Sequence, residues 1–319
     1  MSAATSSQYR RRLAWKQPWI WPLVGVVIVL IITIIVSGRS PASNIEAALQ
    51  QGGIVVMLGL GQMFLITAGN GNVDLSMPGV ITLAGFAGID VAANEHSILL
   101  GLLAAIGVGL ATGAVNVGLI QGIGIPPIVA TLATGLILDS VILSVGASSA
   151  VTPKALHSFS VGRFLNVPNV AWVALGMSII AAVLLHKTIF GRTVVAIGQN
   201  RKAAVRSGLK VRSALMACYL ISGLCAGVAG LLLSAMTGAS IDIGTPFLLV
   251  SIAVVVLGGS RIRGGRSNVI GIWVGSILLN VLLTLFYSLH LSSAYQYIAE
   301  GVIVVVVLAG AADREGFTQ

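Results

Sequence analysis

Four basic side chains lie close together in the stretch GQNRKAAVRSGLK, residues 198–210: Arg201, Lys202, Arg206 and Lys210. Side chains of this kind bind nucleic-acid phosphates, mark the cytoplasmic side of a membrane protein, or pair with acidic groups on a partner. Only 8% of the chain is charged, so a cluster this dense needs one of these explanations.

Carboxylates inside apolar runs are the second set of candidates for chemistry. Asp139 lies in LATGLILDSVILS and Glu300 in YIAEGVIVV. A carboxylate in a spanning helix is costly and normally faces a bundle interior or water. For Asp139 two interpretations stay open, an ion pair with Arg163 or Lys154, or contact with a polyol ligand.

The stretch TAGNGNVDLSMPG predicts a helix broken at membrane depth, which is tolerated where it lines a cavity or is covered by protein. Asp74 either caps the following helix or faces a ligand in such a cavity. We favour capping, with Ser76 as the competing cap. The residues that we place along a polar pathway through the membrane are Asn72, Asp74, Ser76, Thr131 and Asp139.

No group of residues in the sequence is suited to catalysis or metal binding. The four histidines are scattered singly, and an intramembrane enzyme would need a nucleophile with a base, or a metal cluster. Cys218 and Cys225 lie two helical turns apart, too far for a disulfide. The phosphate-binding motif G-x-x-x-x-G-K-[ST] is absent, so we expect this chain to bind no cofactor or metal.

The composition excludes a soluble protein. Hydrophobic residues make up 56% of the 319 residues and the mean hydropathy is +1.01, whereas soluble domains carry about 25% charged residues. Around ten apolar runs are long enough to cross about 30 Å of hydrocarbon, and at that depth they must be helices. The predicted fold class is an all-α, polytopic membrane protein with about ten transmembrane helices. Their expected centres are Ile28, Met57, Ala84, Gly107, Gly135, Ile179, Leu224, Val255, Leu278 and Val304.

The basic residues predict an N-in, C-in orientation. With the N-terminus inside, all but three of the 18 Lys and Arg residues are cytoplasmic, the exceptions being Arg39, Lys154 and Arg163. This bias explains the basic stretch without nucleic acid, for which aromatic stacking residues are also too sparse. The predicted organisation is a cytoplasmic tail (1–19), one transmembrane domain (20–312) with a cytoplasmic loop at 187–213, and a second cytoplasmic tail (313–319).

Outside the membrane, the longest segment runs over 146–169. It is either a lip that receives a molecule from outside or an ordinary connecting loop, and PKALHSF within it predicts a short interfacial helix.

The cytoplasmic basic stretch also has the pattern of a short helix. Asn200 is a good N-cap residue and Gly208 can supply a left-handed C-terminal cap. A helix of about two turns is unstable alone in water, so it must rest on a surface. Ala203 and Ala204 allow close approach to one. A docking helix and a solvated basic loop are both open interpretations.

The run FGRTVVAIGQNRKAAVRSGLKV resembles the cytoplasmic loop of ABC importer permeases of the ribose, xylose, arabinose and autoinducer-2 type. Further matches follow in order, in IPPIVATLAT, YLISGLCAGVAGLLLSA and VSIAVVVLGGSRIRGGRSNVIGIWVGSILL. The resemblance covers about residues 45–308. The matching residues of the first run are Gly191, Arg192, Ala196, Ile197, Gly198, Asn200, Ala203, Ala204, Ser207 and Gly208.

The resemblance implies the permease subunit of an ATP-binding-cassette importer for a monosaccharide or related polyol, in the bacterial cytoplasmic (inner) membrane. Two permeases pair in the bilayer, an extracytoplasmic binding protein delivers the solute, and a separate ATPase subunit holds the ATP and Mg. The loop 187–213 then couples to the ATPase. The residues implied in coupling are Gly198, Asn200, Arg201, Lys202, Ala203, Ala204, Arg206, Ser207 and Gly208, and the structural glycines are Gly258, Gly259, Gly264 and Gly265.

Several positions depart from the family pattern. Asn72 and Pro78 stand where glycines are usual, Asp139 lies near a frequent Arg position, and Ser267 replaces a glycine. These departures bear on which solute is carried, not on the fold. The alternatives are a permease for branched-chain amino acids or nucleosides, and a self-sufficient secondary carrier or channel with charged relays in its spans.

Overall fold

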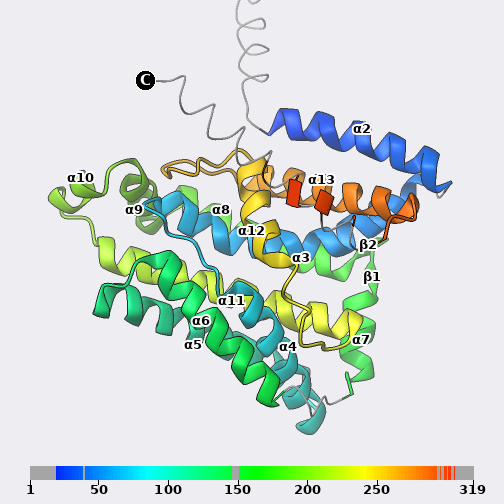
Figure 1. Ribbon diagram of the computed structural model, residues 1–319, viewed down its shortest axis with the longest axis horizontal. Coiled ribbons are helices and arrows are strands. Elements are labelled where there is room, and N and C mark those ends of the chain that lie inside the picture. Colours follow the sequence, from blue (N-terminus) through cyan, green and yellow to red (C-terminus); the bar gives the residue numbers. More distant parts are fainter. Residues whose placement is uncertain are drawn as a thin grey trace, which may run out of the picture.

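The computed structural model describes residues 19–38, 40–145 and 151–292, and beyond them only residues 295, 298, 299, 301, 302 and 305. These residues are almost entirely helical (Figure 1). The elements are α2 (Ile20–Ser37), α3 (Pro41–Ala68), α4 (Met77–Asn94), α5 (Ile98–Val117), the π-helix η1 (Gly118–Ile123), α6 (Pro127–Val145), α7 (Lys154–Val161), β1 (Arg163–Phe164), β2 (Val167–Pro168), α8 (Asn169–Lys187), α9 (Ile189–Gln199), α10 (Arg201–Arg206), α11 (Val211–Thr237), α12 (Phe247–Leu257) and α13 (Val269–Ser288).

Eight of the described helical segments are long and apolar enough to cross a membrane. They are α2, α3, α4, α5 continued by η1, α6, α8, α11 and α13, and each contains one of the predicted centres. The chain is therefore an all-α, polytopic membrane protein, as predicted.

The prediction of a full-length span centred on Val255 is wrong. That residue lies in α12, which has 11 residues and so extends only about 16 Å at 1.5 Å per residue. Pro246 precedes the helix, and Gly258 and Gly259 end it, the latter with φ +84°. Apolarity continues beyond these residues, but the helix does not. The predicted centre at Val304 and the carboxylate of Glu300 lie outside the described residues.

Helix α3 is the centre of the fold. It crosses the middle of the molecule, with α13 and α2 on one side and α11, α4, α5 and α6 on the other (Figure 1). Its residues from Gly52 to Ala68 are all buried. Glycines let the neighbours approach closely: a Cβ added at Gly53 would lie 2.9 Å from Val170 of α8, and one at Gly61 would lie 2.9 Å from the Cα of Ser222 in α11.

A second close contact joins α11 to α5 and α4. A Cβ at Gly109 would overlap the backbone of Gly223, one at Gly227 would overlap that of Ala105, and one at Gly230 would overlap that of Ile81. The runs GVGLATGAVNVG and GLCAGVAG place small residues at spacings that predict close helix approach in lipid, and these contacts confirm it.

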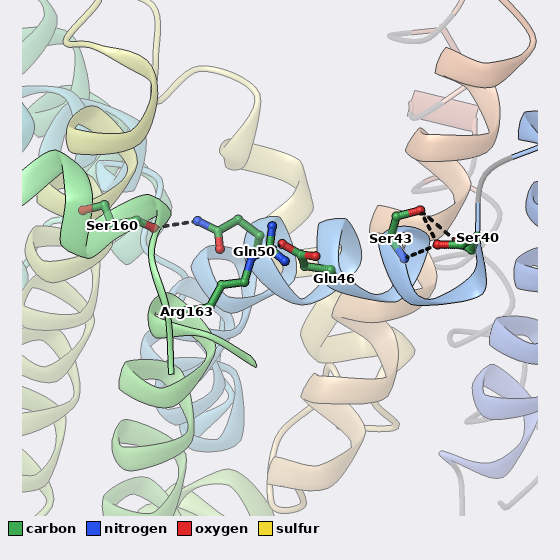
Figure 2. A network of polar contacts seen from close by, with 6 residues as sticks. All are labelled: Ser40, Ser43, Glu46, Gln50, Ser160 and Arg163. Atoms are coloured by element: carbon green, nitrogen blue, oxygen red, sulfur yellow. Dashed lines mark hydrogen bonds and ion pairs between the residues drawn. The ribbon is translucent and has the colours of Figure 1, made fainter. Parts of the chain in front are cut away.

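The segment that was predicted to lie outside the membrane is described from residue 151 to residue 169. It contains the predicted short helix, α7, and is bonded to α3. Figure 2 shows Gln50 and Glu46 pointing from α3 toward this segment. The Nε2 of Gln50 donates to the carbonyl of Ser160 at 2.6 Å, and the Nε of Arg163 lies 2.7 Å from the Oε1 of Glu46. Of the interpretations left open for Asp139, the ion pair with Arg163 is therefore wrong, because this arginine pairs with Glu46.

We expect the Glu46–Arg163 ion pair to contribute under about 1 kcal/mol to stability, because both side chains are partly solvated, at 32% and 57% exposure. A double-mutant cycle with Glu46→Gln and Arg163→Gln, followed by thermal unfolding of the purified chain, measures the coupling. Gln50→Ala is the comparison, since it removes the neighbouring hydrogen bond of the same segment. A coupling above about 2 kcal/mol would contradict the assignment of this pair as a surface contact.

Candidate coupling and translocation site

The basic stretch folds as α10, a helix of 6 residues capped at both ends. The side chain of Asn200 accepts a hydrogen bond from the N–H of Ala203 at 3.0 Å. At the other end Gly208 has φ +75°, and its N–H donates to the carbonyl of Val205 at 3.0 Å. The next N–H along the chain donates to the carbonyl of Ala204 at 3.2 Å, which completes a Schellman motif. Both predicted caps are confirmed.

Helix α10 lies at one extremity of the molecule (Figure 1). Its basic side chains and Ala203 are exposed, and so is the apolar side chain of Val205, at 56%. Ala204 is only 3% exposed and packs against the chain itself. Both alanines were expected to allow close approach to a surface, but only Ala203 is exposed on α10.

Three chain segments meet backbone to backbone beside α10: the end of α3, the end of α9 and the loop after α12. We call this the glycine junction, formed by Thr67, Gly69, Gly198, Gly264 and Gly265. A Cβ at Gly198 would overlap both the carbonyl oxygen of Thr67 and the N of Gly265. The N–H of Gly265 donates to that same carbonyl at 2.8 Å. A Cβ at Gly264 would lie 2.8 Å from the Cα of Gly69.

The predicted structural glycines thus divide between two contacts. Gly264 and Gly265, with φ +95° and +79°, belong to the glycine junction. Gly258 lies against Gly271 so closely that a Cβ on either would overlap the backbone of the other, and it joins α12 to α13. Gly259 turns the chain between these two contacts.

Ser267, which stands where the family pattern has a glycine, has a defined partner. Its Oγ forms a short hydrogen bond with the Oγ1 of Thr67, whose carbonyl already accepts from Gly265. The serine therefore adds a side-chain bond to the glycine junction.

The break between α3 and α4 is held by a buried hydrogen-bond network around Asp74, which is 2% exposed. Its Oδ1 accepts from the N–H of Ser76 at 3.0 Å and from the Oγ of Ser76 at 2.5 Å. Its Oδ2 accepts from the Oγ of Ser222 in α11 at 2.7 Å. The Nδ2 of Asn116 in α5 donates to Ser76 at 2.9 Å. The carboxylate of Asp74 therefore bonds to the chain itself at the entry to α4.

Asn72 connects the network to the glycine junction. Its backbone N–H and its Nδ2 both donate to the carbonyl of Gly69, at 3.1 and 2.7 Å. Its Oδ1 accepts from the hydroxyl of Tyr219 at 3.0 Å. Gly69 also contacts the loop after α12 and the end of α9, which leads into the candidate coupling helix α10. This residue therefore belongs both to the break and to the glycine junction.

Thr131 lies beside the break, whereas Asp139 stands apart. The Oγ1 of Thr131, on a fully buried side chain, is 3.3 Å from the carbonyl of Val73. Asp139 is on the exposed face of α6. The structure therefore brings together Asn72, Asp74, Ser76 and Thr131 of the five predicted pathway residues.

Sequence reasoning missed three members of the network, Gln62, Tyr219 and Ser222. Gln62 accepts the N–H of Asp74 with its Oε1 at 3.2 Å. All three are polar side chains within strongly apolar helices, and all are fully buried. That placement was a usable signal, because a buried polar group needs a partner.

The sequence model of the family described as branched-chain amino acid transport system / permease component matches residues 44–308 of this chain. No solved structure matches the chain.

Individual relatives match over nearly the whole length. The chain is 28% identical over 317 residues to the ribose import permease protein RbsC of Escherichia coli (strain K12), covering 95% of this chain and 98% of that protein. It is 30% identical over 293 residues to RbsC of Bacillus subtilis (strain 168), covering 90% of each. It is 26% identical over 304 residues to the L-arabinose ABC transporter permease protein AraH of Azospirillum brasilense, covering 91% and 88%. The chain therefore belongs to the branched-chain amino acid transport system permease component family.

Proposed function

We propose that this chain is the permease subunit of an ATP-driven importer that translocates a monosaccharide or related polyol. The observation that carries the proposal is α10, an exposed, doubly capped helix whose base is joined through the glycine junction to a polar break in the membrane domain. A movement that a partner protein imposes on α10 would reach that break through backbone contacts.

The proposed partners are those of such an importer. A separate ATPase subunit binds α10 and holds the ATP and Mg, a second permease completes the membrane unit, and an extracytoplasmic binding protein delivers the solute. ATP and Mg are assigned to the ATPase subunit and not to this chain. Gly198, Asn200, Arg201, Lys202, Ala203, Arg206, Ser207 and Gly208 are the residues that we propose for coupling, with Ala204 supporting them from below.

We further propose about ten crossings, which count the short helix α12 with its non-helical flanks and the span predicted at Val304, with both termini in the cytoplasm of a bacterium and the chain in its cytoplasmic membrane. Arg263, in the loop after α12, lies at the same end of the molecule as α9 and α10, because its carbonyl contacts Gly69 of the glycine junction. Two basic loops at one end support a cytoplasmic location for that end.

The nature of the solute is proposed from the relatives. The family description names branched-chain amino acids, but the relatives described above import ribose or arabinose by name. A sugar is therefore favoured over an amino acid or a nucleoside. A self-sufficient carrier is less favoured, because Asp74 is fully engaged in hydrogen bonds within the break.

We expect Ala203→Glu to reduce sugar uptake at least about tenfold without unfolding the protein, because it adds an acidic group to the exposed surface of α10. Ala204→Glu is expected to lower stability by about 3 kcal/mol or more, since it buries an unpaired charge. The measurements are thermal unfolding, co-purification of the ATPase identified by mass spectrometry, and uptake of labelled ribose and arabinose. Ala203→Ser, which keeps the small size, is the control. Full uptake and ATPase association in Ala203→Glu would refute docking through α10.

A further inference from the structure

A cavity of about 330 Å³ lies between the break and the start of α10. Its walls come from four parts of the chain: the loop after α3, the segment from η1 to the start of α6, the first residue of α10 and the first turns of α11. The polar residues that line it are Asn70, Asn72, Gln121, Arg201 and Arg212. Its composition is unusual for a cavity that adjoins a membrane domain, because two of its walls carry arginine.

The two arginines give the cavity a positive charge without an internal counter-ion. Among the described residues, no Asp or Glu forms an ion pair with Arg201 or Arg212. Arg212 is held in place by a reciprocal pair of bonds: its Nη2 donates to the carbonyl of Gln121 at 2.8 Å, and the Nε2 of Gln121 donates to the carbonyl of Arg212 at 3.0 Å. These bonds use one of the five N–H groups of the guanidinium, so donors remain for an anion.

The remaining walls suit a polyol. Asn70, Asn72 and Gln121 carry amides that each form bonds within the chain. Each amide keeps a second N–H and a further lone pair, which can bond to hydroxyl groups. Asn70 is exposed in the left-handed conformation, at φ +56°, while Asn72 forms a buried part of the wall with 5% exposure. Leu215 and the proline pair after Ile125 supply apolar surface for the face of a sugar ring.

We propose that this cavity binds a phosphomonoester of a small polyol, with its phosphate at Arg201 and Arg212 and its hydroxyls at the three amides. Guanidinium groups bind phosphate through paired, charge-assisted hydrogen bonds, whereas a neutral sugar would leave both arginines unpaired. The location of the cavity at the cytoplasmic face rests on the proposed function. A reaction that phosphorylates an imported sugar would supply such a ligand.

A bound phosphomonoester would contact the break, η1 and the start of α10 at once. It would therefore hold together three elements that an import cycle has to move relative to one another. The cavity shares Arg201 with the residues that we propose for coupling, whereas Arg212 and the three amide side chains of its wall lie outside that set.

The test is equilibrium binding of radiolabelled ribose 5-phosphate to the full-length chain in nanodiscs of phosphatidylcholine, with inorganic phosphate and ribose as competitors. We expect binding that is displaced by inorganic phosphate and much less by ribose. Arg212→Gln is expected to weaken binding of the ester at least about tenfold. Lys187→Gln, which removes a charge at the end of α8 outside the cavity, is expected to leave binding unchanged.

A second variant keeps the proposal testable if Arg212→Gln does not fold. Asn70→Gly keeps the left-handed backbone and removes one amide. It should therefore weaken binding of the ester and leave the affinity for inorganic phosphate unchanged. No binding of ribose 5-phosphate to the folded wild-type chain would overturn the proposal, and so would equal binding by folded Arg212→Gln. Displacement of the ester by phosphatidylglycerol but not by inorganic phosphate would also overturn it, by assigning the cavity to a lipid headgroup.

These measurements need neither the ATPase nor uptake. A chain that imports sugar but binds no ester would overturn this proposal alone. A chain that binds the ester but never associates with an ATPase would overturn the proposed function alone.

Discussion

Gly198→Ala is expected to abolish sugar uptake and to lower stability by about 3 kcal/mol or more, at or above the upper end of the usual range for overpacking. The new methyl group would overlap the carbonyl oxygen of Thr67 and the N of Gly265, which are both backbone atoms and cannot change rotamer. One of the three segments of the glycine junction must therefore move. The measurements are thermal unfolding of the purified chain and uptake in proteoliposomes that contain the ATPase.

Gly176→Ala is the matched control for Gly198→Ala. It makes the same change in a helical glycine of α8, where an added Cβ has no neighbour within 4 Å. Stability and uptake should stay close to those of the wild type. If Gly198→Ala behaved like this control, the close contact between α9 and the end of α3 would be wrong.

Asp74→Ala is expected to lower stability by about 3 kcal/mol or more, because it leaves the N–H of Ser76 and the hydroxyl of Ser222 buried without an acceptor. Loss of the folded protein, seen as a lower unfolding temperature and a lower yield, should precede any specific transport defect. The measurement compares unfolding temperature with uptake per folded molecule.

Two variants separate the structural role of Asp74 from a role in contacting the solute. Asp74→Asn keeps an acceptor for Ser76 and a polar group for Ser222, so it should retain most of the stability. Ser222→Ala removes a single donor and should cost about 1 kcal/mol. A folded Asp74→Ala variant of normal stability that has lost transport would show instead that the carboxylate serves the solute.

Features set by neighbouring residues were predictable from the sequence. The caps of α10 depend on Asn200 and Gly208, which lie within one or two turns of the groups that they bond. The spans follow from runs of apolar residues, because hydrocarbon forces internal backbone bonding. The glycine patterns indicated close helix contacts, although not which helices would meet.

Features that depend on residues far apart in the sequence were not predictable. Asp74 and Ser222 are 148 positions apart, and no local pattern pairs them. Arg163 pairs with Glu46 instead of Asp139 because α7 packs on α11 and α8, and β2 on α3. Burial of Ala204 but not Ala203 also depends on what lies beneath α10 in the folded chain.

The burial of α3 from Gly52 to Ala68 has a consequence for how the protein is made. This helix leaves the ribosome well before its neighbours α8, α11 and α13, which follow later in the chain. The hydroxyl of Ser276, for example, donates to the carbonyl of Gly52 across 224 positions. Until those helices are synthesised, the glycine-containing surface of α3 and the amide of Gln62 contact lipid or a chaperone. Nascent chains that stop before α13 would carry an unfinished centre, and these are the forms that a membrane protease should recognise first.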